Sequence, residues 1–305
     1  CDTDTHKADD FSDIFDARAF YDTADLFSAD LAADVAVICS PNGLHASHTV
    51  EALKAGFHVL CEKPMAISTA DCRLMMEAAH NAGKQLVIVK QNRFNPPVAV
   101  LKKLIDEGRL GRIFNIQLNC YWNRSASYYQ DSWHGRMDLD GGTLFTQFSH
   151  FIDLLQWVAG DVNNIQATLS NFMHKDLIEF EDTGVVLFEF ATGAIGSLNY
   201  TVSSHNKNME GSMTVFGEKG TVKIGGQYLN ELEYQDIEDY AIASLQPGNR
   251  PNEYGTYSGS MSNHEKVYEN LIDVLKFDKE PAADGMDGLK TVAIIEKIYQ
   301  SAKRI

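Results

Sequence analysis

Short apolar runs alternate with helix-like segments over the first third of the chain. The apolar runs lie at 35–39, 58–61 and 85–89, and helical spacing of apolar positions occurs near residue 26 and at 44–55, 69–82 and 97–107. This alternation is typical of βαβ units around a parallel sheet. Gly56 and Gly83 each stand just past one of these helices, as helix-ending glycines do. We therefore expect an α/β, Rossmann-like fold in this part of the chain.

The pattern changes after Gly111. Residues 113–119 alternate between apolar and polar positions, which suits a strand with one covered face. Two hairpins with glycine in their turns are predicted at 185–202 and 213–224. Helical spacing returns at 144–158, 264–275 and 288–302, and 225–262 is predicted to be a long loop. We expect a dinucleotide-binding domain at 1–111 and an α+β domain with a largely antiparallel, open sheet at 112–305.

The sequence begins without an apolar run ahead of its first helix-like segment. A dinucleotide-binding βαβ unit carries a glycine-rich turn after its first strand and an acidic residue at the end of its second. Asp2 fits that acid, which would hydrogen-bond the adenosine ribose, and the alternative is an ordinary polar residue. On the first interpretation, the first strand, the glycine-rich turn and most of the second strand precede Cys1.

Charge and composition exclude several classes of partner. The chain has 305 residues and a formal net charge of −16, which disfavours nucleic acids and anionic membranes as partners. No apolar stretch approaches the roughly 20 residues needed to span a bilayer. The five cysteines include no C-x-x-C pair. We therefore expect reduced thiols, no metal centre and a cytoplasmic protein.

Polar and reactive side chains follow each of the first three apolar runs. Ser40, Asn42 and His45 come after the first run, Glu62 and Lys63 after the second. Gln91-Asn92 follow the third. In an open parallel sheet the ligand crevice lies at the carboxyl ends of the strands. The alternatives are a solvated lysine and ordinary turn chemistry in Pro41-Asn42-Gly43.

These motifs carry a family resemblance. With Ser40-Pro41-Asn42, Glu62-Lys63-Pro64 and the helix around His150, the chain resembles the Gfo/Idh/MocA oxidoreductases, which are NAD(P)-dependent sugar and inositol dehydrogenases. The chain is also similar to the bacterial UDP-N-acetylglucosaminuronate 3-dehydrogenases at residues 91–96, 121–125, 128–129, 133–135 and 147–153. Those enzymes oxidise the sugar C3 hydroxyl during biosynthesis of surface-polysaccharide sugars.

The resemblance implies partners as well as a reaction. It implies NAD as the cofactor, with NADP disfavoured because Asp2 would repel a 2′-phosphate. It also implies a small nucleotide-sugar substrate and a homodimer or homotetramer. Other sugar or inositol dehydrogenases and NAD-dependent glycosidases of the same family remain alternatives. A non-catalytic NAD- or sugar-binding regulator is a further alternative, which the presence of both Lys63 and His150 disfavours.

Two residues are expected to carry the chemistry. Lys63 would stabilise a developing alkoxide or relay a proton, and His150 would act as general base. The alternative for His150 is a structural histidine. Many family members carry an aspartate where this chain has Thr146, so Asp153 is considered as the residue that orients the imidazole ring, or as a surface acid.

The remaining expected roles are binding roles. The residues expected to contact the cofactor are Asp2, Ser40, Asn42, His45, Glu62, Lys63 and Gln91. Those expected to contact the substrate are Asn92, Arg93, Arg124, Tyr128, Trp133, Thr146 and His150. Arg93 and Arg124 would bind a carboxylate or diphosphate, because guanidinium groups bind both bidentately. Tyr128, Tyr129 and Trp133 would stack on a sugar face or on uracil.

Overall fold

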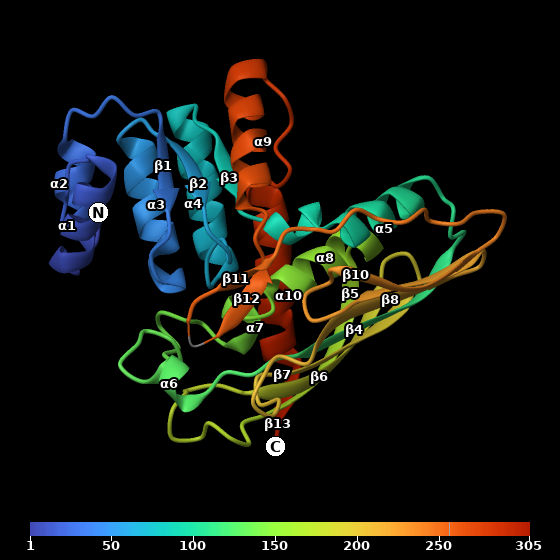
Figure 1. The fold of residues 1–305 in the computed structure, drawn as a ribbon. Coiled ribbons are helices and arrows are strands. Elements are labelled where there is room, and N and C mark those ends of the chain that lie inside the picture. Colours follow the sequence, from blue (N-terminus) through green and yellow to red (C-terminus); the bar gives the residue numbers. More distant parts are fainter. Residues whose placement is uncertain (256) are drawn as a thin grey trace.

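A small parallel sheet forms the first part of the molecule. The structure, a computed structural model, describes residues 1–255 and 257–305. The strands run in the order β1-β2-β3 and are joined by two helices, while two more helices precede them (Figure 1). The bounds are α1 (Thr5–Phe15), α2 (Thr23–Ser28), β1 (Val35–Ile38), α3 (His45–Lys54), β2 (His58–Cys61), α4 (Thr69–Ala82) and β3 (Leu86–Ile88). The predicted parallel sheet is confirmed.

Helix α4 shows which local residues made its bounds predictable from the sequence. The Ser68 hydroxyl accepts the backbone N–H of Asp71, which satisfies one of the free donors at the helix start. Gly83 ends the helix with a positive φ of 63°. Cys72 and Met75 turn one face of the helix into the core. The predicted bounds of this helix are therefore the observed ones.

A larger sheet forms the second part. Its strands run in the order β10-β9-β8-β4-β7-β6-β5-β13. Neighbours are antiparallel except for the β4–β7 and β5–β13 pairs, which are parallel. The bounds are β4 (Ile113–Tyr121), β5 (Val162–Ser170), β6 (Thr183–Phe190), β7 (Ile195–Thr201), β8 (Glu210–Gly217), β9 (Gly220–Gly225), β10 (Glu231–Ile237) and β13 (Ala302–Arg304). The predicted α+β part with a largely antiparallel sheet is thus confirmed.

Helices cover one face of the larger sheet. They are α5 (Pro96–Asp106), α8 (Ser149–Ala159) and α10 (Gly285–Ser301), seen above the sheet in Figure 1. Side chains alternate accordingly along β6, where Val186 and Phe188 are buried and Val185 and Leu187 are exposed. No described helix lies over the opposite face (Figure 1). Of the helices that the structure describes, none is both long and apolar enough to cross a membrane.

The last two helices return to the first sheet. Val267 and Leu271 of α9 (His264–Phe277) pack against Leu60 and Val87 of the small sheet. Helix α10 lies against α4 and so closely against the β2 loop that a Cβ on Gly288 would be 2.6 Å from the sulfur of Met65. The two sheets therefore share helices, and the division at 111 and 112 stays a prediction.

Two expectations about elements were wrong, and one strand was missed. The segment 225–262 is not a long loop, because β10 extends the sheet and β11 (Pro251–Glu253) pairs with β12 (Ser258–Met261). Thr256, in the same segment, lies outside the described residues. The helix expected at 144–158 is two helices, α7 (Thr143–Thr146) and α8, and β5 was not predicted. Strand β10 is an edge strand with mostly exposed residues, and its only apolar alternation, Leu232 and Tyr234 between polar neighbours, is short.

Candidate active site

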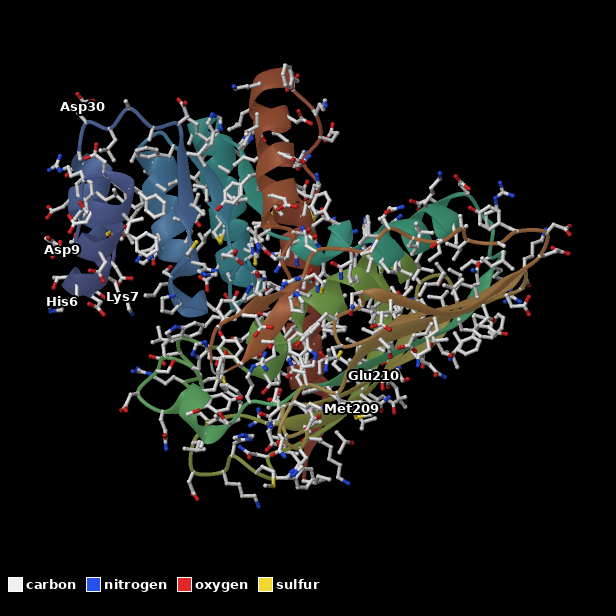
Figure 2. All side chains as sticks on the ribbon, viewed as in Figure 1. His6, Lys7, Asp9, Asp30, Met209 and Glu210 are labelled. Atoms are coloured by element: carbon white, nitrogen blue, oxygen red, sulfur yellow. The ribbon has the colours of Figure 1, made fainter. Side chains whose placement is uncertain are left out.

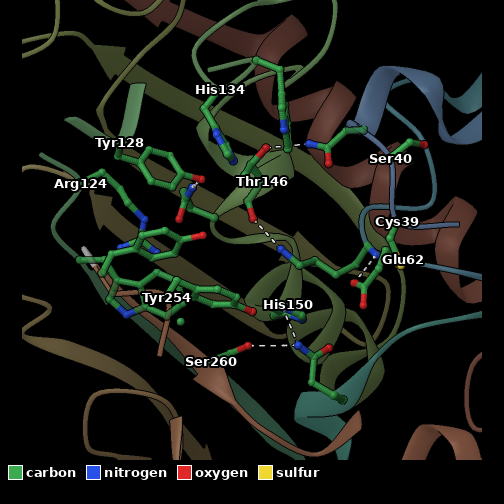
Figure 3. Close-up of a pocket in the computed structure, with 18 of the residues that line it drawn as sticks. Cys39, Ser40, Glu62, Arg124, Tyr128, His134, Thr146, His150, Tyr254 and Ser260 are labelled. Atoms are coloured by element: carbon green, nitrogen blue, oxygen red, sulfur yellow. Dashed lines mark hydrogen bonds between the residues drawn. The ribbon is translucent and has the colours of Figure 1, made fainter. Parts of the chain in front are cut away.

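A cavity of about 220 Å³ opens where the carboxyl ends of the small sheet meet α7, α8 and the β11–β12 hairpin (Figure 3). It brings together most of the residues that the sequence singled out. Those on its wall are Ser40, Asn42, His45, Glu62, Lys63, Gln91, Arg124, Tyr128, Trp133, Thr146 and His150. Asp2, Asn92 and Arg93 are not on this wall. Residues from distant parts of the chain thus converge on one site.

Lys63 reaches across the cavity to α7. Its Nζ donates a hydrogen bond to the Thr146 carbonyl at 2.8 Å, and its backbone N–H donates to Glu62 Oε2 at 3.1 Å. Burial lowers the pKa of Lys63 to about 8, against the opposing effect of the Glu62 carboxylate. An amine with such a pKa can gain or lose a proton near neutral pH, as acid–base catalysis requires.

His150 lies on the floor of the cavity, at the start of α8. Its Nε2 is 3.4 Å from Nε2 of Gln91, which also donates to the Ser260 hydroxyl at 3.1 Å (Figure 3). Its Nδ1 has no hydrogen-bond partner among the described residues. Burial, with the nearby charge of Lys63, holds the pKa of His150 well below its usual range. The imidazole is therefore neutral at physiological pH and can accept a proton.

Asp153 does not orient the His150 ring. Both of its carboxylate oxygens accept hydrogen bonds from Arg93, at 2.9 and 2.8 Å, and Lys90 Nζ lies 3.3 Å away. Arg93 also pairs with Asp287. This buried network ties the end of β3 to α8 and α10. It corrects the expectation that Arg93 contacts the substrate, because its guanidinium is bound to protein carboxylates behind the cavity.

Two further expected contacts lie away from the cavity. Asn92 is buried, and its side-chain amide has no partner among the described residues. Asp2 is exposed at the start of the chain, where its Oδ1 accepts the backbone N–H of Asp4 at 2.9 Å. The ribose contact proposed for Asp2 stays a prediction.

The loops after β1 and β2 are locked together by His45. Its Nδ1 lies 2.7 Å from the Pro64 carbonyl and its Nε2 lies 2.8 Å from the Ser40 carbonyl. Burial lowers the pKa of His45. Asn42 similarly donates to the Thr146 hydroxyl at 2.7 Å and to the Asp140 carbonyl at 2.9 Å. Both side chains therefore shape the cavity through bonds to the protein, in addition to lining it.

Arg124 is a buried cation without a carboxylate partner in the described part of the chain. It is 2% exposed, and it donates from Nη1 to the Asn123 carbonyl and to Asn208. Its Nε has no partner among the described atoms. The guanidinium stands over aromatic rings at 4.8 to 5.4 Å, those of Trp122, Tyr128 and Tyr257. A desolvated charge of this kind favours an anionic ligand.

Comparisons with known proteins decide the family. The family model "Oxidoreductase family, NAD-binding Rossmann fold" matches residues 1–91, and "GFO/IDH/MocA C-terminal domain" matches residues 98–223. The WlbA dehydrogenase of Bordetella pertussis, solved with NADH and UDP-GlcNAcA, is 35% identical with a TM-score of 0.88. That likeness covers 99% of this chain and 86% of the other. The chain belongs to the Gfo/Idh/MocA family of oxidoreductases.

Other relatives agree with this assignment. The WlbA dehydrogenase of Chromobacterium violaceum, solved with the same two ligands, is 34% identical over 99% of this chain and 84% of the other, with a TM-score of 0.87. The levoglucosan dehydrogenase of Pseudarthrobacter phenanthrenivorans is 26% identical over 74% of this chain. The aligned part spans only 62% of that dehydrogenase. The expected family, fold class and NAD-binding part are confirmed.

The residues of this Gfo/Idh/MocA chain fit the nicotinamide end of NAD. The carboxyl ends of β1, β2 and β3 present Ser40, Glu62 and Gln91 to one cavity. Gln91 Oε1 is buried and has no partner in the described part of the chain. A free amide oxygen beside a strand end can accept a hydrogen bond from a carboxamide or a ribose hydroxyl. That these three residues would hold the cofactor here stays a prediction.

Several wall residues of this family member were missed by sequence reasoning. They are His134, Tyr254, Tyr257, Ser260 and His264, of which His264 Nε2 lies 3.3 Å from Glu62 Oε1. Asp140, which is not on the wall but accepts a hydrogen bond from the wall residue Thr146, was missed as well. The hairpin residues stood in a segment predicted to be a loop, and only the fold brings them over the cavity. Asp140 had a signal, because it immediately precedes the Gly141-Gly142 turn.

Proposed function

We propose that the protein oxidises the C3 hydroxyl of a nucleotide-linked uronic acid sugar, UDP-N-acetylglucosaminuronic acid, with NAD as the oxidant. The observation that carries this proposal is the buried Arg124, which has no carboxylate partner among the described residues and lines the same cavity as Lys63 and His150. A substrate carboxylate would supply the missing negative charge. The likeness to two WlbA dehydrogenases solved with NADH and UDP-GlcNAcA supports the same substrate class.

The chain's own residues supply the proton chemistry. NAD, when bound, supplies the hydride acceptor. His150 is neutral, so it can take the proton of the reacting hydroxyl. Lys63, when protonated, places a positive charge beside the oxygen that becomes negative. The aromatic rings of Tyr128 and Tyr257 exclude water from the Arg124 side and offer flat surfaces to a sugar ring.

The first test is NADH formation by the full-length protein with UDP-N-acetylglucosaminuronic acid. We expect steady NADH accumulation, measured by its absorbance, and little with free sugars or inositols. A parallel assay with 2-oxoglutarate detects an enzyme that retains its cofactor, because the 2-oxo acid would be reduced as NADH is reoxidised. Turnover with free sugars or inositols alone would contradict the substrate. Glycoside cleavage without net NADH would favour the glycosidase alternative, and NAD binding without any turnover would favour the regulator.

The uncovered face of the larger sheet supports a homodimer. Val185, Leu187 and Ile195 share this face and are 48%, 54% and 57% exposed. Figure 2 shows the side chains of the sheet, with Met209 and Glu210 labelled where no described helix covers them. Neighbouring exposed apolar residues on a sheet favour association with a second copy of the chain.

A charge on this face is expected to separate the subunits. We expect light scattering to give at least twice the monomer mass for the unmodified protein and the monomer mass for Leu187→Glu. Ile272→Glu on α9 is the matched control, since Ile272 is 50% exposed on a helix away from the sheet face. An unchanged mass in Leu187→Glu would contradict an interface at this face.

A further inference from the structure

A buried carboxyl group lies beside the Lys63 site, on the turn that leads into α7. Asp140 is 2% exposed. Its Oδ2 accepts the backbone N–H of Gly135 at 2.8 Å, and its Oδ1 accepts the Thr146 hydroxyl. No lysine or arginine of the described chain forms an ion pair with it at contact distance. Burying a carboxylate without a contacting cation costs desolvation free energy. We therefore expect Asp140 to have a specific role at this position.

Thr146 connects this carboxyl group to Lys63. The Thr146 hydroxyl donates to Asp140, and the Thr146 carbonyl accepts the Lys63 Nζ hydrogen bond at 2.8 Å. Asn42 donates to the same hydroxyl and to the Asp140 carbonyl. Thr146 is therefore held on one side by Asp140 and Asn42 while it holds Lys63 on the other.

The turn that carries Asp140 has little freedom. Gly142 has a φ of +135°, and a Cβ there would lie 2.2 Å from the Tyr299 hydroxyl. That hydroxyl in turn accepts the backbone N–H of Leu144 at 3.2 Å. The close approach of Tyr299 requires glycine and fixes the path from Asp140 into α7. The carboxyl group is thus set at one place relative to Thr146.

We propose that Asp140 is a positioning residue for Lys63. By its hydrogen bond with the Thr146 hydroxyl, Asp140 holds in place the Thr146 carbonyl that accepts the Lys63 hydrogen bond. Its negative charge also favours the protonated form of the Lys63 amine. This inference rests on the proposed function only in giving Lys63 a role in proton chemistry. The family resemblance implies an aspartate at the position of Thr146 in many members. In this chain the carboxyl group reaches the same neighbourhood from the preceding turn.

The charges around both groups set the direction of the effect. Burial raises the pKa of Asp140 to about 6, so it is ionised where Lys63 titrates, at about 8. Glu62 and Asp140 favour the Lys63 ammonium, whereas Arg124 and Lys90 oppose it. Other titratable groups of the described chain that face Lys63 or Asp140 are His45, His134, His150, Tyr128, Tyr129 and Tyr299. Removing the Asp140 charge must therefore lower the pKa of Lys63.

The test reads the protonation of Lys63 directly. Brief exposure to acetic anhydride at a series of pH values acetylates only the neutral amine, and peptide mass spectrometry follows the Lys63 peptide. For the unmodified protein we expect a midpoint at about pH 8. For Asp140→Asn, which keeps the shape and an acceptor for Gly135, we expect the midpoint to fall by about one pH unit. An unchanged or higher midpoint would overturn the proposal.

Two further variants distinguish loss of the Asp140 charge from general disruption of the structure around Lys63. Asp138→Asn makes the same change at an aspartate on the same turn whose side chain is 63% exposed, and we expect an unchanged midpoint. Asp140→Asn combined with Thr146→Asp moves the carboxylate to position 146, and we expect the midpoint to return toward pH 8. If Asp140→Asn alone does not fold, the double variant decides, since a low midpoint there would overturn the proposal. The assay uses neither NAD nor sugar, so failure of the proposed substrate would leave its result readable.

Discussion

Replacing Lys63 with alanine is expected to reduce turnover by roughly 10²–10⁴-fold, the range that a positioned acid–base group contributes. The Lys63 amine lies in the cavity with its pKa lowered to about 8, and it is hydrogen-bonded to the Thr146 carbonyl. Its loss removes the positive charge beside the reacting oxygen while leaving the strand ends that would hold the cofactor. We therefore expect NAD binding, measured by calorimetry, to change much less than turnover.

Two companion variants sharpen this result. Lys54→Ala is the matched control, because Lys54 is an exposed lysine at the end of α3, away from the cavity wall, and turnover should be unchanged. Lys63→Arg keeps the positive charge but cannot give up a proton in the working pH range. Partial activity in Lys63→Arg would assign the residue to charge stabilisation, and full loss would assign it to proton transfer or to strict geometry. Turnover within twofold of normal in Lys63→Ala would contradict a catalytic role.

Replacing Arg124 with methionine is expected to lower kcat/KM for UDP-N-acetylglucosaminuronic acid by about a hundredfold or more, as loss of a buried partner for a charge does. Activity with UDP-N-acetylglucosamine, which lacks the carboxylate, should change far less. Arg136→Met is the matched control, since Arg136 is an exposed arginine paired with Asp138 outside the cavity. Equal losses with both nucleotide sugars would contradict carboxylate recognition by Arg124.

The thermal stability of the same variant gives an independent reading. Arg124 has no carboxylate partner among the described residues, so its burial costs desolvation free energy that no internal ion pair offsets. Methionine retains apolar contact with Trp122, Tyr128 and Tyr257 without that cost. We therefore expect the melting temperature of the free protein to be unchanged or higher. A marked fall would indicate that Arg124 is held for structural reasons.

The sequence predicted best what depends on neighbouring residues. The bounds of α4 follow from Ser68, Gly83 and the spacing between them, all within one segment. The placement of Lys63 followed from a strand, a Glu-Lys-Pro motif and the rule that parallel strands present their carboxyl ends at one edge. Local sequence features were therefore enough to predict the small sheet and about half of the residues that line the site.

The partners of Arg93 and Arg124 could not be predicted from neighbouring residues in the sequence. The sequence favoured substrate binding equally for Arg93 and Arg124, since both follow polar motifs near strand ends. Only the fold brings Asp153 and Asp287 onto Arg93 and leaves Arg124 among aromatic rings. Asp140 was likewise passed over, because its contact with Thr146 depends on the Gly142 turn and on Tyr299 from the far end of the chain.

The return of α9 and α10 to the small sheet bears on how parts of such proteins can be exchanged. An artificial hybrid that takes only residues up to 111 from this chain would leave Leu60 and Val87 without Val267 and Leu271. Recombination between family members to alter cofactor choice therefore has two crossover points to respect, one before β4 and one before α9. The segments to be transplanted together are far apart in the gene and adjacent in the molecule.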